Sequence, residues 1–127
     1  MKNIRILIVE NTELMREALQ LLLEGNGFAV NPNDVLRSSE QAMRRIDVGI
    51  PYDLIITELD MPGVTGINLL KHAVQSKPET KGLLLGLDLD TSYGLQCQTE
   101  AKKVGVLCLE KPINPNHFNA TIQKLLL

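Results

Sequence analysis

Short apolar runs alternate along the chain with segments whose apolar residues recur every three or four positions. The runs are rich in Ile, Leu and Val, and they predict strands buried on both faces of a sheet. The segments between them predict helices with one apolar face. The expected strands are residues 4–9, 28–30, 54–57, 83–87 and 106–109.

Five helices are predicted between and after these strands. The first begins after Asn11-Thr12-Glu13, which offers a helix cap and an acid in the first turn, and stops at Gly25-Asn26-Gly27. Ser38 and Gln41 form a capping box for the second, and Asn114-Pro115 opens the last. The fourth helix, about residues 92–104, is polar and has no clear stripe. The inward positions are expected at Leu14, Ala18, Leu21 and Leu22, at Ala42, Met43 and Ile46, at Ile67, Leu70, Ala73 and Val74, and at Phe118, Ile122 and either Leu125 or Leu126.

Alternating strands and helices favour an α/β fold in which five parallel strands are covered by helices on both faces. In such folds the functional groups lie just beyond the carboxyl ends of the strands. The residues at those positions are Glu10, Asn11, Glu58, Asp60, Asp88 and Lys111. We therefore expect acidic side chains and one lysine to meet at one edge of the sheet.

Composition narrows the class of protein. With 127 residues, 44% of them hydrophobic, and a net charge of -2, residues 1–127 are expected to form one ordered domain. That small charge provides no field to attract nucleic acid or anionic lipid, so neither is expected as a direct partner. No apolar run approaches the roughly 20 residues that span a bilayer. Cys97 and Cys108 lack metal-ligand spacing and are interpreted as reduced thiols of a cytoplasmic protein.

Three segments carry a resemblance to a known family: Ile6-Leu7-Ile8-Val9-Glu10, the stretch from Asp53 to Gly63 with Gly66, and Glu110-Lys111-Pro112. Met61-Pro62 follows Glu58 by three and four residues, and Gly66 follows it by eight. In these features essentially the whole chain resembles the response-regulator receiver domain of two-component signalling. The resemblance implies a flavodoxin-like, doubly wound sheet with strand order 2-1-3-4-5 and five helices. It also implies a cis peptide bond before Pro112.

The resemblance further implies a phosphorylation site at this edge. In the family, an acid pair after strand one and an aspartate after strand three hold Mg²⁺, and the aspartate takes a phosphoryl group from a histidine kinase. A lysine, here Lys111, pairs with the phosphoryl oxygens. A Thr or Ser after strand four and an aromatic residue on strand five then move, which reshapes the face formed by helix four, strand five and helix five.

Most of these chemical positions are altered in this chain. The phosphoacceptor position holds Glu58, whose extra methylene moves the carboxylate by about 1.5 Å, enough to impair an in-line reaction. The Thr/Ser position is Asp88, or Gly86 if strand four is read two residues earlier, and Cys108 replaces the aromatic. A neutral Asn11 replaces the second acid of the pair. A Mg²⁺ site built from Glu10, Asn11, Glu58 and Asp60 is therefore expected to be weak or lost.

Two interpretations of the altered site follow. The favoured one is a pseudo-receiver that acts by protein–protein interaction without phosphorylation, with Glu58 paired to Lys111. Its partner would be a histidine kinase, a covalently attached output domain or another receiver, including a second copy of the chain, bound at the face of helix four, strand five and helix five. The alternative is a divergent receiver that accepts a phosphoryl group at Glu58 with Mg²⁺.

An enzyme or a flavin carrier on the same type of sheet is not favoured. Residues 10–13 offer no glycine to cradle a phosphate, and no serine lies in a glycine-flanked elbow. His72 and His117 lie in helical segments away from the edge.

Overall fold

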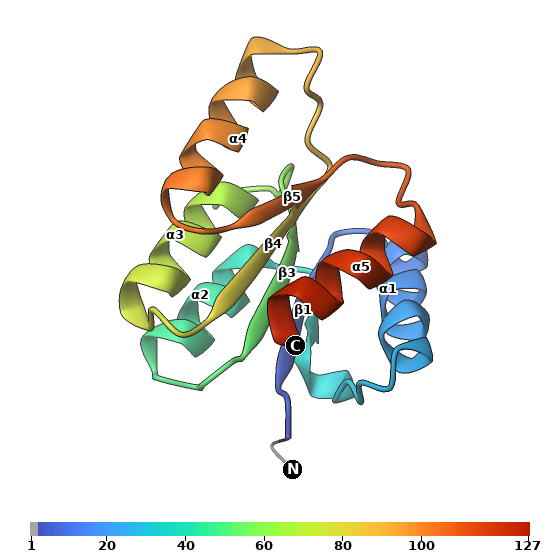
Figure 1. The fold of residues 1–127 in the computed structure, drawn as a ribbon. Coiled ribbons are helices and arrows are strands. Elements are labelled where there is room, and N and C mark those ends of the chain that lie inside the picture. The colour runs from blue at the N-terminus through green and yellow to red at the C-terminus, as the bar shows by residue number, and fades with distance from the viewer. Residues whose placement is uncertain (1–2) are drawn as a thin grey trace.

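The computed structural model describes residues 3–127 as a parallel sheet of order β2-β1-β3-β4-β5 with helices on both faces (Figure 1). The predicted fold class and strand order are confirmed. The strands are β1 (Ile6–Val9), β2 (Val35–Leu36), β3 (Leu54–Glu58), β4 (Lys81–Leu85) and β5 (Leu107–Leu109). The helices are α1 (Glu13–Gly25), the short 3-10 helix η1 (Pro32–Asp34), α2 (Ser39–Asp47), α3 (Gly66–Ser76), α4 (Ser92–Lys103) and α5 (Pro115–Leu126).

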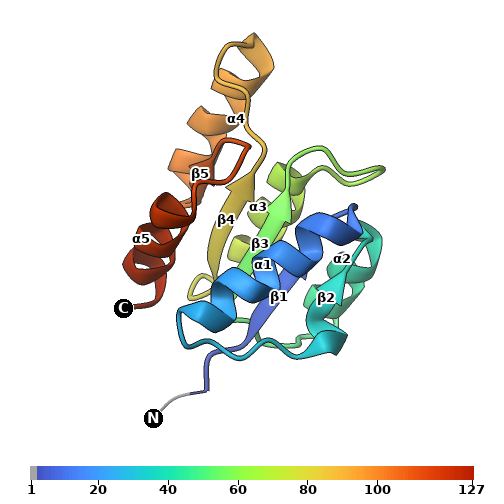
Figure 2. The same cartoon turned by 90° about the vertical axis from the view of Figure 1, so that its right-hand side faces the viewer.

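Helices α1 and α5 cover one face of the sheet, and α2, α3 and α4 cover the other (Figures 1 and 2). Successive strand residues point to opposite faces. In β1, Leu7 and Val9 therefore enter the core beneath α2 and α3, whereas Ile6 and Ile8 enter the core beneath α1 and α5. Burial on both faces explains why the strands have no polar side.

Most of the inward positions predicted for α2, α3 and α5 are buried, and the others (Met43, Val74, Leu125 and Leu126) pack against the core while partly exposed. The Ser38 hydroxyl accepts the backbone N–H of Gln41 at 3.3 Å, which caps α2 as predicted. The Lys111–Pro112 peptide bond is cis. No helix within residues 3–127 has both the length and the apolar character needed to cross a bilayer. The predicted inward residues that are buried are Ala42, Ile46, Ile67, Leu70, Ala73, Phe118 and Ile122.

The second strand lies elsewhere than predicted. Residues 28–30 form no strand, and β2 consists of Val35–Leu36, which pair with Ile8 and Val9 of β1. The apolar run was misleading because Phe28 and Val30 pack on the α1–α5 core as part of a loop. A short apolar run indicates contact with the core, and a partly buried loop produces the same pattern as a strand does.

The predicted inward face of α1 is only partly correct: Leu22 packs against the core and Ala18 is half-buried, but Leu14 and Leu21 point to solvent. Leu19 and Leu23 are fully buried, whereas Leu14 and Leu21 are 80% and 68% exposed. A leucine-rich helix offers more apolar positions than one face can bury. Packing against the sheet therefore selects which side of α1 turns inward.

The register of β4 differs by two residues from the predicted strand 83–87. β4 ends at Leu85, which pairs with Glu58 at the end of β3. Gly86 follows with a φ of 87°, and Asp88 lies further along in the loop before α4. Leu87 is buried, so it extended the apolar pattern past the real end of the strand.

Candidate functional site

Glu10, Glu58 and Lys111 meet at the carboxyl edge of the sheet. Glu10 follows β1, Glu58 ends β3, and Lys111 comes two residues after β5. Lys111 Nζ lies 3.2 Å from Glu10 Oε2 and forms an ion pair with Glu58 Oε2. One ammonium group therefore bridges two carboxylates, and we call these three residues the ion triad.

The carboxylate of Glu10 is fully buried and engaged on both oxygens. Its Oε1 accepts weak hydrogen bonds from the backbone N–H and the hydroxyl of Thr12, each at 3.4 Å, and its Oε2 faces Lys111. Thr12 is the N-cap residue of α1, but its hydroxyl makes no cap bond. Arg16 Nη1 donates to the Glu10 carbonyl at 2.7 Å. The start of α1 is thus organised around Glu10.

Glu58 lies against the glycine that follows β4. Its side chain is 9% exposed. A Cβ atom added at Gly86 would come within 2.4 Å of Glu58 Oε1. The longer carboxylate therefore extends across the end of β4 into space that a side chain at position 86 would occupy.

The other predicted site residues do not join the ion triad. Asn11, Asp60 and Asp88 are exposed. The register that would bring Asp88 to the end of β4 is wrong, because the pairing of Leu85 with Glu58 brings Gly86 there. Asp88 instead accepts the N–H of Asp90 at 3.0 Å in the loop before α4.

Burial and neighbouring charges perturb two pKa values in the ion triad. Burial raises the pKa of Glu58, the Lys111 ammonium opposes this shift, and the Glu10 carboxylate adds to it. Burial by itself would lower the pKa of Lys111, but Glu58 and Glu10 together outweigh it, so the pKa of Lys111 is raised. Lys111 is therefore charged at neutral pH.

The residues at this edge do not fit a Mg²⁺ ion in their present arrangement. Within residues 3–127, no three His, Cys, Asp or Glu side chains are grouped so that they could together hold a metal ion. The Glu10 and Glu58 carboxylates converge on the Lys111 ammonium, and the neutral side chain of Asn11 is exposed. Mg²⁺ prefers several oxygen ligands in octahedral geometry, and a cation already lies between the two available carboxylates.

Cys108 replaces the aromatic residue expected on β5 and is half-buried. Burial raises the pKa of its thiol to about 11. Cys108 also lines a hollow of about 300 Å³ between α4 and α5, together with Leu87, Gln98 and His117. The Cys108 side chain therefore lines a surface depression between α4 and α5.

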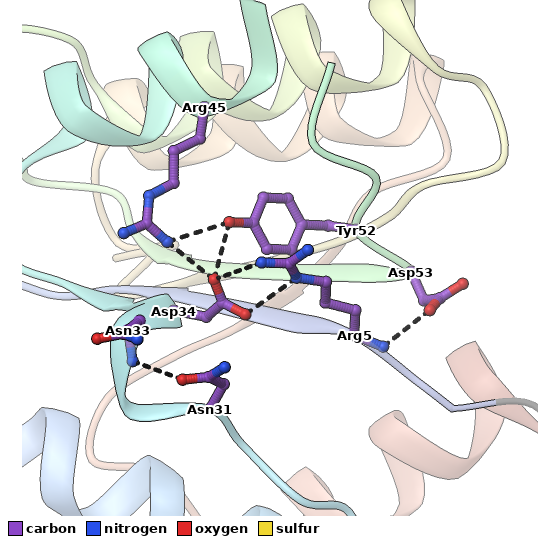
Figure 3. Close-up of polar contacts among 7 residues, drawn as sticks. All are labelled: Arg5, Asn31, Asn33, Asp34, Arg45, Tyr52 and Asp53. Carbon is purple, nitrogen blue, oxygen red and sulfur yellow. Dashed lines mark hydrogen bonds and ion pairs between the residues drawn. The ribbon is translucent and has the colours of Figure 1, made fainter. Parts of the chain in front are cut away.

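A second polar cluster, at the amino ends of the strands, was missed at the level of sequence. Asp34, 1% exposed, accepts hydrogen bonds from Arg5 Nε at 3.1 Å, Arg45 Nη1 at 2.8 Å and the Tyr52 hydroxyl at 3.0 Å (Figure 3). The Arg5 guanidinium also lies 5.1 Å from the centroid of the Tyr52 ring. Asp34 follows Asn31-Pro32-Asn33 and looks like a turn residue, so local sequence contains no signal of this cluster.

Comparison with known proteins assigns the family. The model of the response regulator receiver domain matches residues 6–123. The chain is 29% identical over 120 residues to the transcriptional regulatory protein FixJ of Azorhizobium caulinodans. The match covers 91% of this chain and 52% of the relative. The chain is 34% identical over 106 residues to a protein-glutamate methylesterase/protein-glutamine glutaminase of Desulfotalea psychrophila, covering 83% of this chain and 28% of the relative.

A solved structure agrees with this assignment. The signal receiver domain of an HD domain-containing protein from Pseudomonas fluorescens superimposes with a TM-score of 0.81 at 25% identity, over 99% of this chain and 88% of that one. The chain belongs to the response-regulator receiver family, whose members are signalling domains of two-component systems that interact with histidine kinases and output domains. It spans about half the length of the FixJ proteins that it matches.

Proposed function

We propose that this receiver is a pseudo-receiver, a protein-interaction module whose state does not depend on phosphorylation at position 58. The ion triad carries the proposal. A phosphoryl group would need the nucleophilic oxygen of residue 58, a metal ion beside it and a free lysine to pair with the phosphoryl oxygens. Glu58 and Lys111 are already paired with each other, and Lys111 also neutralises Glu10.

The proposed module holds one conformation because its charged groups are already paired with one another. The charge of Glu58 lies next to Lys111 without any added group. Neither Gly86 nor Cys108 carries a hydroxyl or an aromatic ring that could follow a change at Glu58. A fixed site with no moving partner favours constitutive docking over switching.

The proposed docking face is formed by α4, β5 and α5. Its support is the hollow between α4 and α5, which is lined by both apolar and polar side chains. A histidine kinase, an attached output domain or another receiver, including a second copy of the chain, would bind there. A net charge of -2 supports a protein partner rather than nucleic acid or a membrane. The proposed setting is cytoplasmic, and no enzymatic activity is proposed for the chain.

The test is chemical phosphorylation. The chain is incubated with acetyl phosphate and Mg²⁺, and intact-mass spectrometry measures the phosphoryl adduct. The matched control is the double variant Asn11→Asp with Glu58→Asp, which restores the two carboxylates that the family uses. We expect no adduct on the wild-type chain and a Mg²⁺-dependent adduct on the control.

A stoichiometric, Mg²⁺-dependent adduct at Glu58 of the wild-type chain would show that the alternative, a phosphorylatable receiver, is correct. The link from the ion triad to docking is tested separately with Glu58→Gln. Self-association of the wild type and of this variant is compared by sedimentation equilibrium. Equal association constants would rule out control of docking by the charge of Glu58.

A further inference from the structure

Gly86 and Glu58 occupy adjoining space at the ends of two paired strands. β3 and β4 run side by side (Figure 1), and their last paired residues are Glu58 and Leu85. Gly86 continues from Leu85, and its N–H donates to the Leu109 carbonyl at 3.0 Å. The backbone at position 86 is thus tied to β5 on one side and faces the Glu58 side chain on the other.

The contact between these residues leaves no room for another carbon atom. A Cβ at Gly86 would lie 2.4 Å from Oε1, 3.1 Å from the carboxyl carbon and 3.2 Å from Oε2 of Glu58. All three nearest atoms belong to the same carboxylate. The end of the Glu58 side chain is therefore the first group that a side chain at position 86 would meet.

The same carboxylate is pinned from its other side by Lys111. Glu58 is 7% exposed, so it cannot relax freely into solvent. A side chain at position 86 would have to push the carboxylate off its position, and Lys111 would then lose one of its two acidic partners.

We propose that Gly86 is the positioning residue of the ion triad: by having no side chain, it leaves the space in which Glu58 reaches Lys111. Glu58 and Gly86 therefore act as a matched pair, in which the longer acid depends on the missing side chain. The inference deepens the proposed function and rests on it for the consequence that the pair holds one state. The steric match itself is tested independently of phosphorylation.

The experiment is a double-variant cycle with Glu58→Asp and Gly86→Ala. The positive φ of Gly86 makes any L-residue strained there, so a glycine with the same backbone and no contact is needed as control. Gly105 has a φ of 75°, and a Cβ added to it would meet nothing within 4 Å. The unfolding equilibrium constants of all single and double variants are measured by urea denaturation.

With Glu58 present, we expect Gly86→Ala to raise the unfolding constant about tenfold more than Gly105→Ala does. With Asp at position 58, this excess should disappear, because the shorter carboxylate does not reach the added carbon. An equal excess in both backgrounds would overturn the proposal. If Gly86→Ala fails to fold alone but folds together with Glu58→Asp, the proposal is supported. If it fails in both backgrounds while Gly105→Ala folds, the proposal is wrong.

A second readout follows the position of the carboxylate. Acetylation by a water-soluble succinimidyl ester, resolved by peptide mass spectrometry, measures the reactivity of Lys111 against that of exposed Lys81. In Gly86→Ala, we expect the relative rate at Lys111 to rise severalfold, and in Gly105→Ala we expect no change. An unchanged rate in both variants would contradict the positioning role. If the double-variant cycle shows coupling but acetyl phosphate gives an adduct at Glu58, only the proposed function is refuted. If the cycle shows no coupling and no adduct forms, only the role of Gly86 is refuted.

Discussion

The charge balance at the carboxyl edge of the sheet depends on Lys111. It pairs with Glu10, whose side chain is 1% exposed, and with Glu58. Removing a carboxylate from water is costly unless an opposite charge or hydrogen bonds compensate. One ammonium pairs with two acids here and offsets the burial of Glu58 only in part, so its loss would remove the cation that both acids contact.

Replacing Lys111 with Met should therefore destabilise the fold by about 2 kcal/mol, less than for a fully buried pair because Lys111 itself is partly exposed. The free energy of unfolding in urea measures this. Lys103→Met, at the exposed end of α4, is the control and should change stability by less than about 0.5 kcal/mol. Similar losses in the two variants would show that the ion triad contributes no special stability.

The raised pKa of Glu58, caused mainly by burial, predicts a pH dependence. The folded state holds the Glu58 proton more tightly than the unfolded chain, whose pKa is near the ordinary 4.5. The contribution of Glu58 to stability is thus fully present below pH 4.5 and falls as the pH rises through the higher folded pKa. As the pH rises from 4.5 through the folded pKa, the unfolding free energy of the wild type should therefore fall relative to that of Glu58→Gln. Glu79→Gln, an exposed control, should show no such trend, and a difference that moves in favour of the wild type would contradict the assigned shift.

Among the elements, α1 shows how tertiary contacts select among equivalent apolar positions. Its sequence is rich in leucine on several sides, but the sheet buries Leu19 and Leu23. The exposed Leu21 lines an apolar groove of about 450 Å³ with Met15 and Ile113. Buried Leu19 and exposed Leu21 therefore contribute differently to stability, although both are leucines of the same helix.

Truncating Leu19 to Ala should cost about 3 kcal/mol, because it removes a buried side chain and leaves a cavity. Truncating Leu21 to Ala in the same helix should cost less than about 1 kcal/mol, since that side chain is 68% exposed. Thermal and urea unfolding of the two variants provide the comparison. A larger loss for Leu21→Ala would mean that α1 is rotated about its axis, so that Leu21 rather than Leu19 faces the core.

At the scale of the whole molecule, one charged cluster lies at each end of the sheet. The ion triad lies at the carboxyl ends of the strands. At the amino ends, Asp34 connects Arg5 before β1, Arg45 of α2 and Tyr52 before β3 (Figure 3). This second cluster joins segments far apart in the chain and fixes the start of the two-residue strand β2.

Asp34→Ala should cost about 3 kcal/mol, because it leaves Arg45 and the buried Tyr52 hydroxyl without their shared acceptor. The loss should be accompanied by faster amide exchange in β2 and at the start of β1. Asp90→Ala, in the exposed loop before α4, is the matched control and should be nearly neutral. If both variants unfold at the same urea concentration, the Asp34 cluster does not stabilise the sheet.

Sequence patterns predicted the presence of helices and strands better than they predicted where these elements end and which strands pair. The runs at β1 and β3 marked real strands because burial on both faces makes residues 6–9 and 54–56 apolar throughout. Residues 28–30 and Leu87 were equally apolar but belong to loops. Apolar character records burial, and only pairing with a neighbouring strand distinguishes the two cases.

The candidate site was predictable where the strand end itself set the position. Glu10, Glu58 and Lys111 follow or end parallel strands, so their convergence could be inferred. The role of Gly86 could not be settled, because a shift of two residues in β4 was equally consistent with the apolar pattern. Local sequence also contains no sign that Asp34 accepts bonds from residues 29 and 18 positions away.

The sequence by itself determined the α/β class, the receiver family and the acidic and basic residues at one edge of the sheet, because alternation, strand-end positions and motif spacing are local properties. Only the tertiary structure decided that Glu10 shares Lys111 with Glu58, that Gly86 adjoins Glu58, and that Asp34 bonds to Arg5, Arg45 and Tyr52 at the opposite end of the sheet. These facts depend on strand register and on which side chains share a few ångströms of space. Long-range packing sets both.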